Sequence, residues 1–339
     1  MSINLAKVFP ATFIILMIGF IISDIISRPR ILIIYSYKSD SALVREEEGA
    51  IASILNNSDA RPIIRRHFMG MDKSWSGRSL NIIKHDIDRA IADFRPRILI
   101  SMDDEARAYI AREYGGRNDV NIIFGGVDET IDSQPFFEQK NVTGILEKLP
   151  LLATQELLKY LSNKPLTLMI IGDASVSAQA EAKQIIRYDW GENKLLSSIQ
   201  IKDFQSWQEK ILENSDASDI IFITGYRQLR RSIYSDDIVP GQEVIEWTSA
   251  HTKSLLFAND NDFIEDGGII TLACSPREQA REAALLALKI IAGKNPTELP
   301  IKSGQEFFVH LSKSRLKNRD LLLPQIYESS AQASATMHP

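Results

Sequence analysis

From residue 30 onward, short apolar runs alternate with segments in which apolar residues recur every three or four positions. Arg30–Ser36 (RILIIYS) is a continuous apolar run, of the kind found in strands that are buried on both faces. Ser41–Asn56 carries its apolar residues on one side of a helix. The same two patterns predict further strands at 62–68, 97–101, 121–125, 166–172, 195–201, 219–224, 254–258 and 268–272, and helices at 80–94, 105–114, 151–161, 177–188, 204–213 and 276–292. Strands that alternate with helices of this length indicate βαβ units and parallel sheets.

The alternation restarts after Val142-Thr143-Gly144, which predicts two doubly wound, parallel-sheet α/β lobes joined by a hinge. A chain of 339 residues is long enough for two such lobes. In open parallel sheets, ligands bind beyond the carboxyl ends of the strands. When two such sheets face each other, these ends meet at one cleft. We therefore expect a binding site between the lobes.

A long apolar segment, Val8–Ile26, precedes this alternation. As a helix it would span roughly 30 Å, the thickness of the hydrocarbon core of a bilayer. It predicts one N-terminal transmembrane helix, kept as an uncleaved anchor. A cleaved secretory signal peptide and a buried core helix are the alternatives, although Ser23–Ser27 matches a small-x-small cleavage site poorly. Lys7 on one side balances Arg28 and Arg30 on the other, so the orientation stays open.

Composition argues against nucleic-acid binding, a metal site and catalysis. The net charge is −5 and no run of Lys or Arg offers a footprint for a phosphate backbone. The five histidines are scattered, and the single cysteine, Cys274, is expected to be a small buried residue. There is no glycine-rich phosphate loop, nucleophile elbow or zinc-protease motif, so we predict no cofactor and no catalytic residue. An enzyme on the same scaffold is the remaining alternative.

Two acidic runs have structural explanations. Residues 259–268 resemble a calcium loop only loosely, since the glycine is misplaced and the bidentate Glu is lacking, so we interpret them as a solvated turn. Glu46-Glu47-Glu48 falls in the first turns of a predicted helix, where carboxylates interact favourably with the helix dipole.

Polar residues gather directly after the predicted strands, where a small-molecule cleft requires them. The candidate ligand-binding residues share this position: Ser36, Tyr37, Met102, Asp103, Val127, Asp128, Asp173, Ser175, Thr224, Tyr226, Asn259 and Asp260. Ser and Asp after a strand also cap the next helix, and that explanation stays open for Asp103, Asp173 and Ser175.

The order of three motifs resembles that of the ABC-transporter substrate-binding proteins with the type I periplasmic fold, in the group associated with uptake of tryptophan, tyrosine and related compounds. The motifs are Asn121–Val127 (NIIFGGV), the N-V-T-G sequence of Asn141–Gly144, and residues 266–300, which have a glycine-led strand, a long helix and a closing G-K-N-P turn before Leu299-Pro300. The resemblance extends from about Arg30 to Pro324.

This resemblance implies a domain plan in which the chain crosses three times between the lobes. Residues 1–28 form the anchor or an uncleaved signal, 29–143 with 268–293 the first lobe, 144–267 with 294–324 the second lobe, and 325–339 a flexible tail. It implies hinge closure around a small, aromatic or amino-acid-like ligand and delivery to a membrane permease. The expected location is the inner membrane, single-pass, with the soluble domain outside the cytoplasm.

Two departures from the family pattern favour an alternative function. Family members usually carry a cleaved signal or a lipid-anchoring cysteine, and they have a small-residue-rich first ligand loop where this chain has Tyr35–Lys38. The alternative is a ligand-sensing or structural partner of a membrane complex that reuses the fold without transport.

Overall fold

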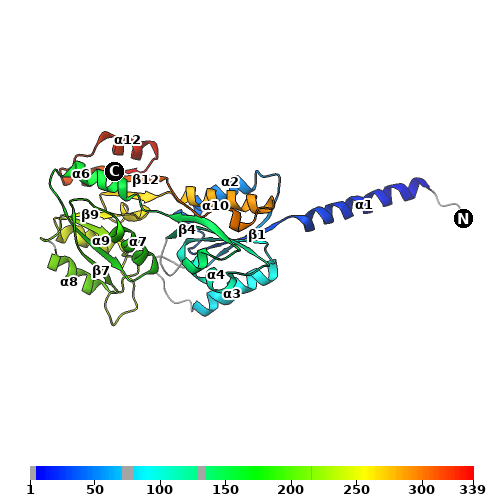
Figure 1. Cartoon of the computed structure of the whole chain (residues 1–339), viewed down its shortest axis with the longest axis horizontal. Helices are drawn as coiled ribbons and strands as arrows, with labels where there is room; N and C mark the ends of the chain where they lie inside the picture. The colour runs from blue at the N-terminus through cyan, green and yellow to red at the C-terminus, as the bar shows by residue number, and fades with distance from the viewer. Residues whose placement is uncertain (1–4, 71–79, 129–133, 215) are drawn as a thin grey trace.

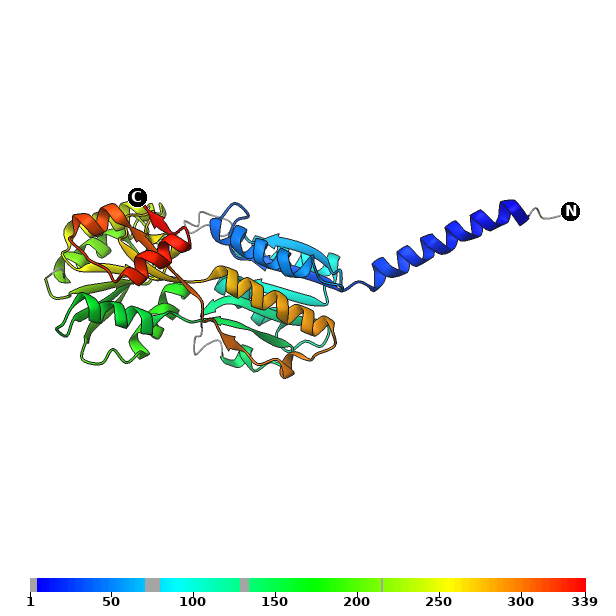
Figure 2. The ribbon, with the colours of Figure 1, turned by 90° about the horizontal axis from the view of Figure 1, so that it is seen from above.

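The computed structural model describes residues 5–70, 80–128, 134–214 and 216–339. Two α/β lobes lie side by side, and the N-terminal helix projects away from the first of them (Figures 1 and 2). Each lobe is built on its own sheet.

The first lobe contains a six-stranded sheet in the order β11-β5-β4-β3-β1-β2, with every pair parallel. Its strands are β1 (Arg30–Tyr35), β2 (Ile63–Phe68), β3 (Ile98–Met102), β4 (Asn121–Asp128), β5 (Val142–Glu147) and β11 (Lys302–Ser303). Its helices are α2 (Ala42–Leu55), α3 (Leu80–Phe94), α4 (Asp103–Tyr114), α5 (Gln134–Phe137) and α10 (Pro276–Ile291), with the short 3-10 helix η3 (Pro296–Glu298).

Alternate residues of β1 face opposite helical layers, because successive side chains of a strand point to opposite faces. Ile31 and Ile33 are buried in the core that includes side chains of α2 and α10. Leu32 and Ile34 are buried in the core that includes side chains of α3 and α4. This explains why the strand reads as a continuous apolar run.

The second lobe contains a seven-stranded sheet in the order β13-β12-β10-β9-β8-β6-β7. Its strands are β6 (Thr167–Asp173), β7 (Lys194–Ile201), β8 (Ile220–Ile223), β9 (Leu255–Ala258), β10 (Ile270–Cys274), β12 (Phe307–Ser312) and β13 (Met337–His338). Its helices are α6 (Leu151–Leu161), α7 (Val176–Arg187), α8 (Phe204–Asn214), α9 (Gly241–His251), α11 (Lys313–Asn318) and α12 (Gln325–Ala333), with the short η2 (Asn261–Phe263). Unlike the predicted all-parallel sheet, this one is mixed, since β12 runs antiparallel to β10.

The sheets place the three chain crossings later than the predicted boundaries at 143/144, 267/268 and 293/294. The first crossing follows β5, which belongs to the first sheet; the second lies between β10 and α10; the third lies between β11 and β12. The predicted boundaries lie within β5 and before β10 and β11. In the structure each of these strands still pairs in the sheet of the lobe that the chain is leaving, and the chain crosses only after it. The prediction that α10 returns to the first lobe agrees with its packing on α2, β4 and β5.

Residues 325–339, predicted to be a flexible tail, instead form α12 and β13 on the second lobe. Ala331 is fully buried in the core of that lobe. The hydroxyl of Tyr327 donates to the carbonyl oxygen of Ala153 at 3.1 Å. Strand pairing with β12 and this packing hold the segment in place.

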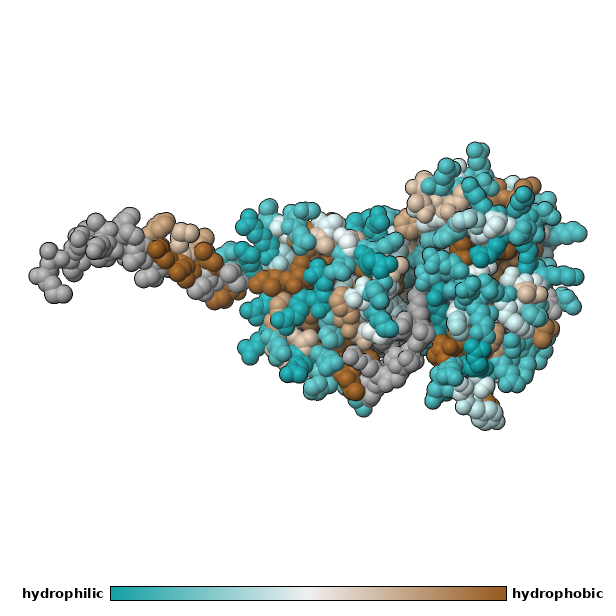
Figure 3. Space-filling model, turned by 180° about the vertical axis from the view of Figure 1, so that it is seen from behind, coloured by the Kyte–Doolittle hydropathy of each residue, from teal (hydrophilic) through white to brown (hydrophobic). Residues whose placement is uncertain are grey.

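The helix α1 (Leu5–Ser27) has 23 residues and carries large apolar side chains that are exposed. These include Phe13, Leu16, Met17, Ile18 and Phe20. Figure 3 shows brown apolar side chains on this helix beside the mainly hydrophilic surface of the two lobes. Within the described residues, no helix meets the length and hydropathy expected of a membrane-spanning helix.

Candidate functional site

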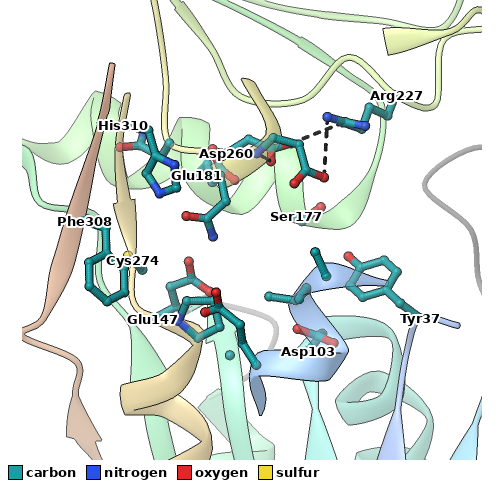
Figure 4. Close-up of a pocket in the computed structure, with 18 of the residues that line it drawn as sticks. Tyr37, Asp103, Glu147, Ser177, Glu181, Arg227, Asp260, Cys274, Phe308 and His310 are labelled. Atoms are coloured by element: carbon teal, nitrogen blue, oxygen red, sulfur yellow. Dashed lines mark hydrogen bonds and ion pairs between the residues drawn. The ribbon is translucent and has the colours of Figure 1, made fainter. Parts of the chain in front are cut away.

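A cavity of about 730 Å³ lies between the two lobes and is lined by both. Residues from the first lobe, such as Tyr37 and Asp103, face residues from the second, such as Glu181 and Asp260 (Figure 4). The cavity lies beyond the carboxyl ends of the strands of both sheets, where ligands bind in open α/β folds.

The structure brings eight of the twelve sequence-predicted residues to this cavity. They are Tyr37, Asp103, Asp173, Ser175, Thr224, Tyr226, Asn259 and Asp260.

Three of the other four residues are buried outside the cavity. Ser36, Met102 and Val127 are fully buried and do not line it. The hydroxyl of Ser36 donates to the carbonyl oxygen of Met102 at 2.9 Å and accepts from the amide of Ala106 at 3.0 Å, so it joins β1 to β3 and α4. Asp128 ends β4, and its side chain lies outside the described part of the chain.

The capping explanation fits Ser175 but not Asp103. The hydroxyl of Ser175 accepts from the amide of Ala178 at 3.2 Å and caps α7. Asp103 is instead the first residue of α4, with φ at +69°, a conformation that costs free energy in a non-glycine residue. Its Oδ2 atom is buried and has no hydrogen-bond partner among the described residues.

Asp173 supports the loops of the second lobe. One carboxylate oxygen accepts from the amide of Ser175 and the other from the amide of Gln228, each at 3.0 Å. With both oxygens bonded to the backbone, its side chain fixes the shape of the cavity wall.

Acidic side chains of the second lobe neutralise the positive charge of Arg227. Its guanidinium forms ion pairs with Asp260 at 3.4 Å, with Asp262 at 3.6 Å, and with Asp266. The run 259–268, expected to be a solvated turn, thus forms one wall of the cavity. Within the described residues, no group of side chains is arranged to hold a metal ion.

Most of the acidic side chains that line the cavity are not among the residues predicted from the sequence. Besides Asp103, the missed residues Glu47, Glu105, Glu147 and Glu181 line it, and we refer to these five as the cleft carboxyls. Across the described part of the chain, no ion pair includes any of them.

Burial raises the pKa of every cleft carboxyl, and repulsion from neighbouring carboxylates adds to the effect. The pKa of Glu105 and of Glu147 rises to about 7. The pKa values of Glu47, Asp103 and Glu181 rise well above the ordinary range, since burial is accompanied by repulsion from other cleft carboxyls. Without a ligand, the cavity therefore binds protons that exposed carboxylates would release.

Glu47 could have been found in the sequence. It occupies the buried stripe of α2 together with Val44, Ile51 and Leu55, at the spacing of an apolar helix face. The predicted interaction with the helix dipole does not hold for Glu47, because α2 begins at Ala42 and Glu47 lies beyond its first turn. A glutamate on an otherwise apolar stripe indicates a buried carboxyl.

The remaining wall comes from the last part of the second lobe. Phe308 and His310 of β12 line the cavity beside Cys274 at the end of β10 (Figure 4). Burial, with a smaller contribution from His338, lowers the pKa of His310 to about 4, so its imidazole is neutral at pH 7. Cys274 is buried, as predicted, and its thiol donates to the carbonyl oxygen of Lys148 at 3.2 Å.

Comparison with known proteins gives one family match. The model of the ABC transporter substrate binding protein family matches residues 122–334. No curated protein sequence matches the chain.

Solved structures share the fold at low sequence identity. A conserved domain protein from Vibrio cholerae O1 biovar El Tor has a TM-score of 0.66 at 13% identity, over 92% of this chain and 100% of that one. An ABC domain from Streptococcus pneumoniae in complex with L-Trp has a TM-score of 0.64 at 11% identity, over 88% and 98%. A ligand-free, open substrate binding protein with adhesive properties from Clostridium difficile has a TM-score of 0.66 at 12% identity, over 87% and 96%.

Proposed function

Because the chain belongs to the ABC transporter substrate binding protein family, we propose that it binds a small solute between its lobes and delivers it to a membrane permease. Members of this family bind substrates for transporters and are not enzymes, so this protein is a binding protein rather than a catalyst. The observation that carries the proposal is the cavity of about 730 Å³ at the facing strand ends, which has the volume of a small-molecule site.

The three crossings support a hinge at the base of this cavity. The carboxylate of Glu278, at the start of α10, accepts from the amides of Gln305 at 2.9 Å and Glu306 at 2.8 Å. The amide of Ser275 donates to the carbonyl oxygen of Glu306 at 3.1 Å, and that of Gly304 to Leu146 at 2.8 Å. All three crossings are thus hydrogen-bonded near one place, so the lobes can turn about it as two bodies.

A ligand screen on the full chain tests solute binding. Amino acids, amines, sugars and organic acids are added in turn, and the melting temperature is measured, because a ligand that binds only the folded state raises it. We expect at least one compound small enough for the cavity to raise the melting temperature by several degrees. A screen without any shift would favour the alternative function, a structural partner of a membrane complex.

We also propose that α1 holds the protein at the membrane, with the two lobes outside the cytoplasm. The proposal is supported by the exposed apolar side chains of α1 and by the single charge between Val8 and Ile26. We expect the full chain to stay in the membrane pellet after carbonate extraction. Ile18→Arg places a charge in the middle of the segment, which costs about 3 kcal/mol, and should move protein to the supernatant. Equal extraction of both proteins would refute the anchor.

A further inference from the structure

Among the described residues, no cleft carboxyl forms an ion pair; Arg107, whose charge lowers the pKa of Glu105, pairs with Asp104 at 3.1 Å. Glu47 is 1% exposed and Asp103 is 8% exposed, and each has an oxygen without a hydrogen-bond partner among the described residues. Both line the cavity, and so does Glu105, which has a further unpartnered oxygen. A buried carboxylate without a partner is costly, so each of these groups takes up a proton unless a cation in the cavity stabilises its charged form.

The cationic side chains of the cavity cannot fill this role. Arg227 already pairs with three carboxylates of the second lobe. Arg277 is exposed, and across the described residues no ion pair joins it to a cleft carboxyl. Among the described residues that line the cavity, no buried cation is left unpaired, so a ligand carboxylate would meet mainly negative charge there.

The cleft carboxyls lie on both lobes. Glu47, Asp103, Glu105 and Glu147 belong to the first lobe, and Glu181 belongs to α7 of the second. Figure 4 shows Glu147 and Asp103 below the open space and Glu181 above it. In their charged forms the two sets repel each other across the cavity, and a ligand with a positive charge at each end would stabilise these charged forms and replace the repulsion with attraction.

Other features favour an organic cation over a metal ion. Within the described part of the chain, no cluster of acidic side chains, His or Cys has the geometry to coordinate a metal. The ring of Tyr37 lines the cavity beside Asp103, and Phe308 lines its other side (Figure 4). Aromatic faces attract ammonium groups and pack against methylene chains. The cavity therefore offers carboxylates for two charged ends and apolar contacts for the chain between them.

We infer that the solute is an organic amine with two or more ammonium groups and no carboxylate, such as a linear diamine or polyamine. This inference rests on the proposed function, because it names the ligand of the same cavity. It differs from the amino-acid-like ligand implied by the sequence resemblance.

Calorimetric titration of the full chain tests the inference with putrescine, spermidine and spermine. The matched controls are 1,4-butanediol, which lacks both charges, butylamine, which has one, and L-Trp, L-Lys and Mg²⁺. We expect the diamine or polyamines to bind at least tenfold more tightly than butylamine, with no heat from the diol.

Variants then locate the binding. Glu181→Gln and Asp103→Asn keep the shape of each side chain, and Asn tolerates the positive φ of position 103. Each should weaken amine binding at least tenfold, because a charge-assisted hydrogen bond is lost. Their melting temperatures should equal or exceed that of the unchanged protein, because like-charge repulsion is relieved, so weaker binding cannot be ascribed to unfolding. Glu113→Gln, at the exposed end of the same helix α4, should leave binding unchanged.

The outcomes separate the two proposals. Binding of L-Trp or a neutral solute without amine binding would overturn the cation inference and leave solute binding intact. Tighter binding of Mg²⁺ than of any amine, or amine binding that neither variant weakens, would also overturn it. A protein that binds neither the amines nor any compound of the broad screen would overturn both.

Discussion

Replacing Glu105 by Gln should stabilise the ligand-free protein at neutral and alkaline pH. Glu105 lies in the first turn of α4, where the helix dipole favours a carboxylate. Burial and the neighbouring Asp104 outweigh that effect and raise the pKa of Glu105 from its ordinary value of 4.5 to about 7. The folded protein therefore holds a proton on this group that the unfolded chain releases.

The sign and size of the effect follow from this difference. Between pH 4.5 and pH 7 the folded state binds more protons than the unfolded state, so the free energy of unfolding falls as the pH rises through this window. At about 1.4 kcal/mol per pH unit, the charged side chain costs about 3 kcal/mol above pH 7 and nothing below pH 4. Glu105→Gln removes this cost and keeps an acceptor oxygen.

Urea denaturation from pH 4 to pH 8 measures the difference. The variant and the unchanged protein should have similar free energies of unfolding at pH 4, and the variant should be more stable by about 3 kcal/mol at pH 8. Glu113→Gln, on the exposed end of α4, serves as the control and should show no such divergence. A stability difference that is constant with pH, or a variant less stable at pH 8, would refute the argument.

Three further changes test the fold, the first of them with a matched control. Gly144→Ala should destabilise by about 1–3 kcal/mol in denaturant titration, because the new methyl would lie 2.4 Å from the carbonyl oxygen of Phe124. Gly49→Ala, inside α2 with no atom within 4 Å, should be neutral or stabilising, and equal losses at both sites would contradict the clash. Asn141→Ala should lower the free energy of unfolding by about 2–4 kcal/mol, since the buried side-chain amide forms hydrogen bonds with three backbone groups. An unchanged denaturation midpoint would show that these hydrogen bonds make no net contribution to stability. Removing residues 325–339 should lower the melting temperature, because it exposes the hydrophobic core of the second lobe. An unchanged melting temperature would show that α12 does not contribute to stability.

The sequence predicted the layer structure because the apolar periods are strong. The runs at β1, β3 and β6 and the long helix α10 agree with the structure within two residues. The resemblance to ABC-transporter substrate-binding proteins is confirmed by the family match. Lobe membership was less accurate, since it depends on which strand a segment pairs with, and pairing between distant segments leaves no local signal.

For a similar reason, the sequence predicted only some of the residues that line the cavity. Residues directly after strands, such as Tyr37 and Thr224, could be found because strand ends mark the cavity. Glu147 was missed because β5 was not predicted, and Glu181 because it lies one turn inside α7 rather than at its start. Acidic side chains contributed by helices from different parts of the chain become neighbours only through the tertiary fold.

The three crossings also set the order in which the protein can fold as it is made. The first sheet has its edge strand, β11, at residues 302–303, and the helix α10 that covers one of its faces comes just before it. The second sheet likewise includes two strands from the end of the chain, β12 and β13. A growing chain released as far as residue 267 would contain neither lobe in complete form, because the first lobe still lacks α10 and β11 and the second still lacks β10, β12 and β13. The first lobe is complete only once residue 303 has emerged, and the second only once residue 338 has, so neither lobe can finish folding until most of the chain has been made.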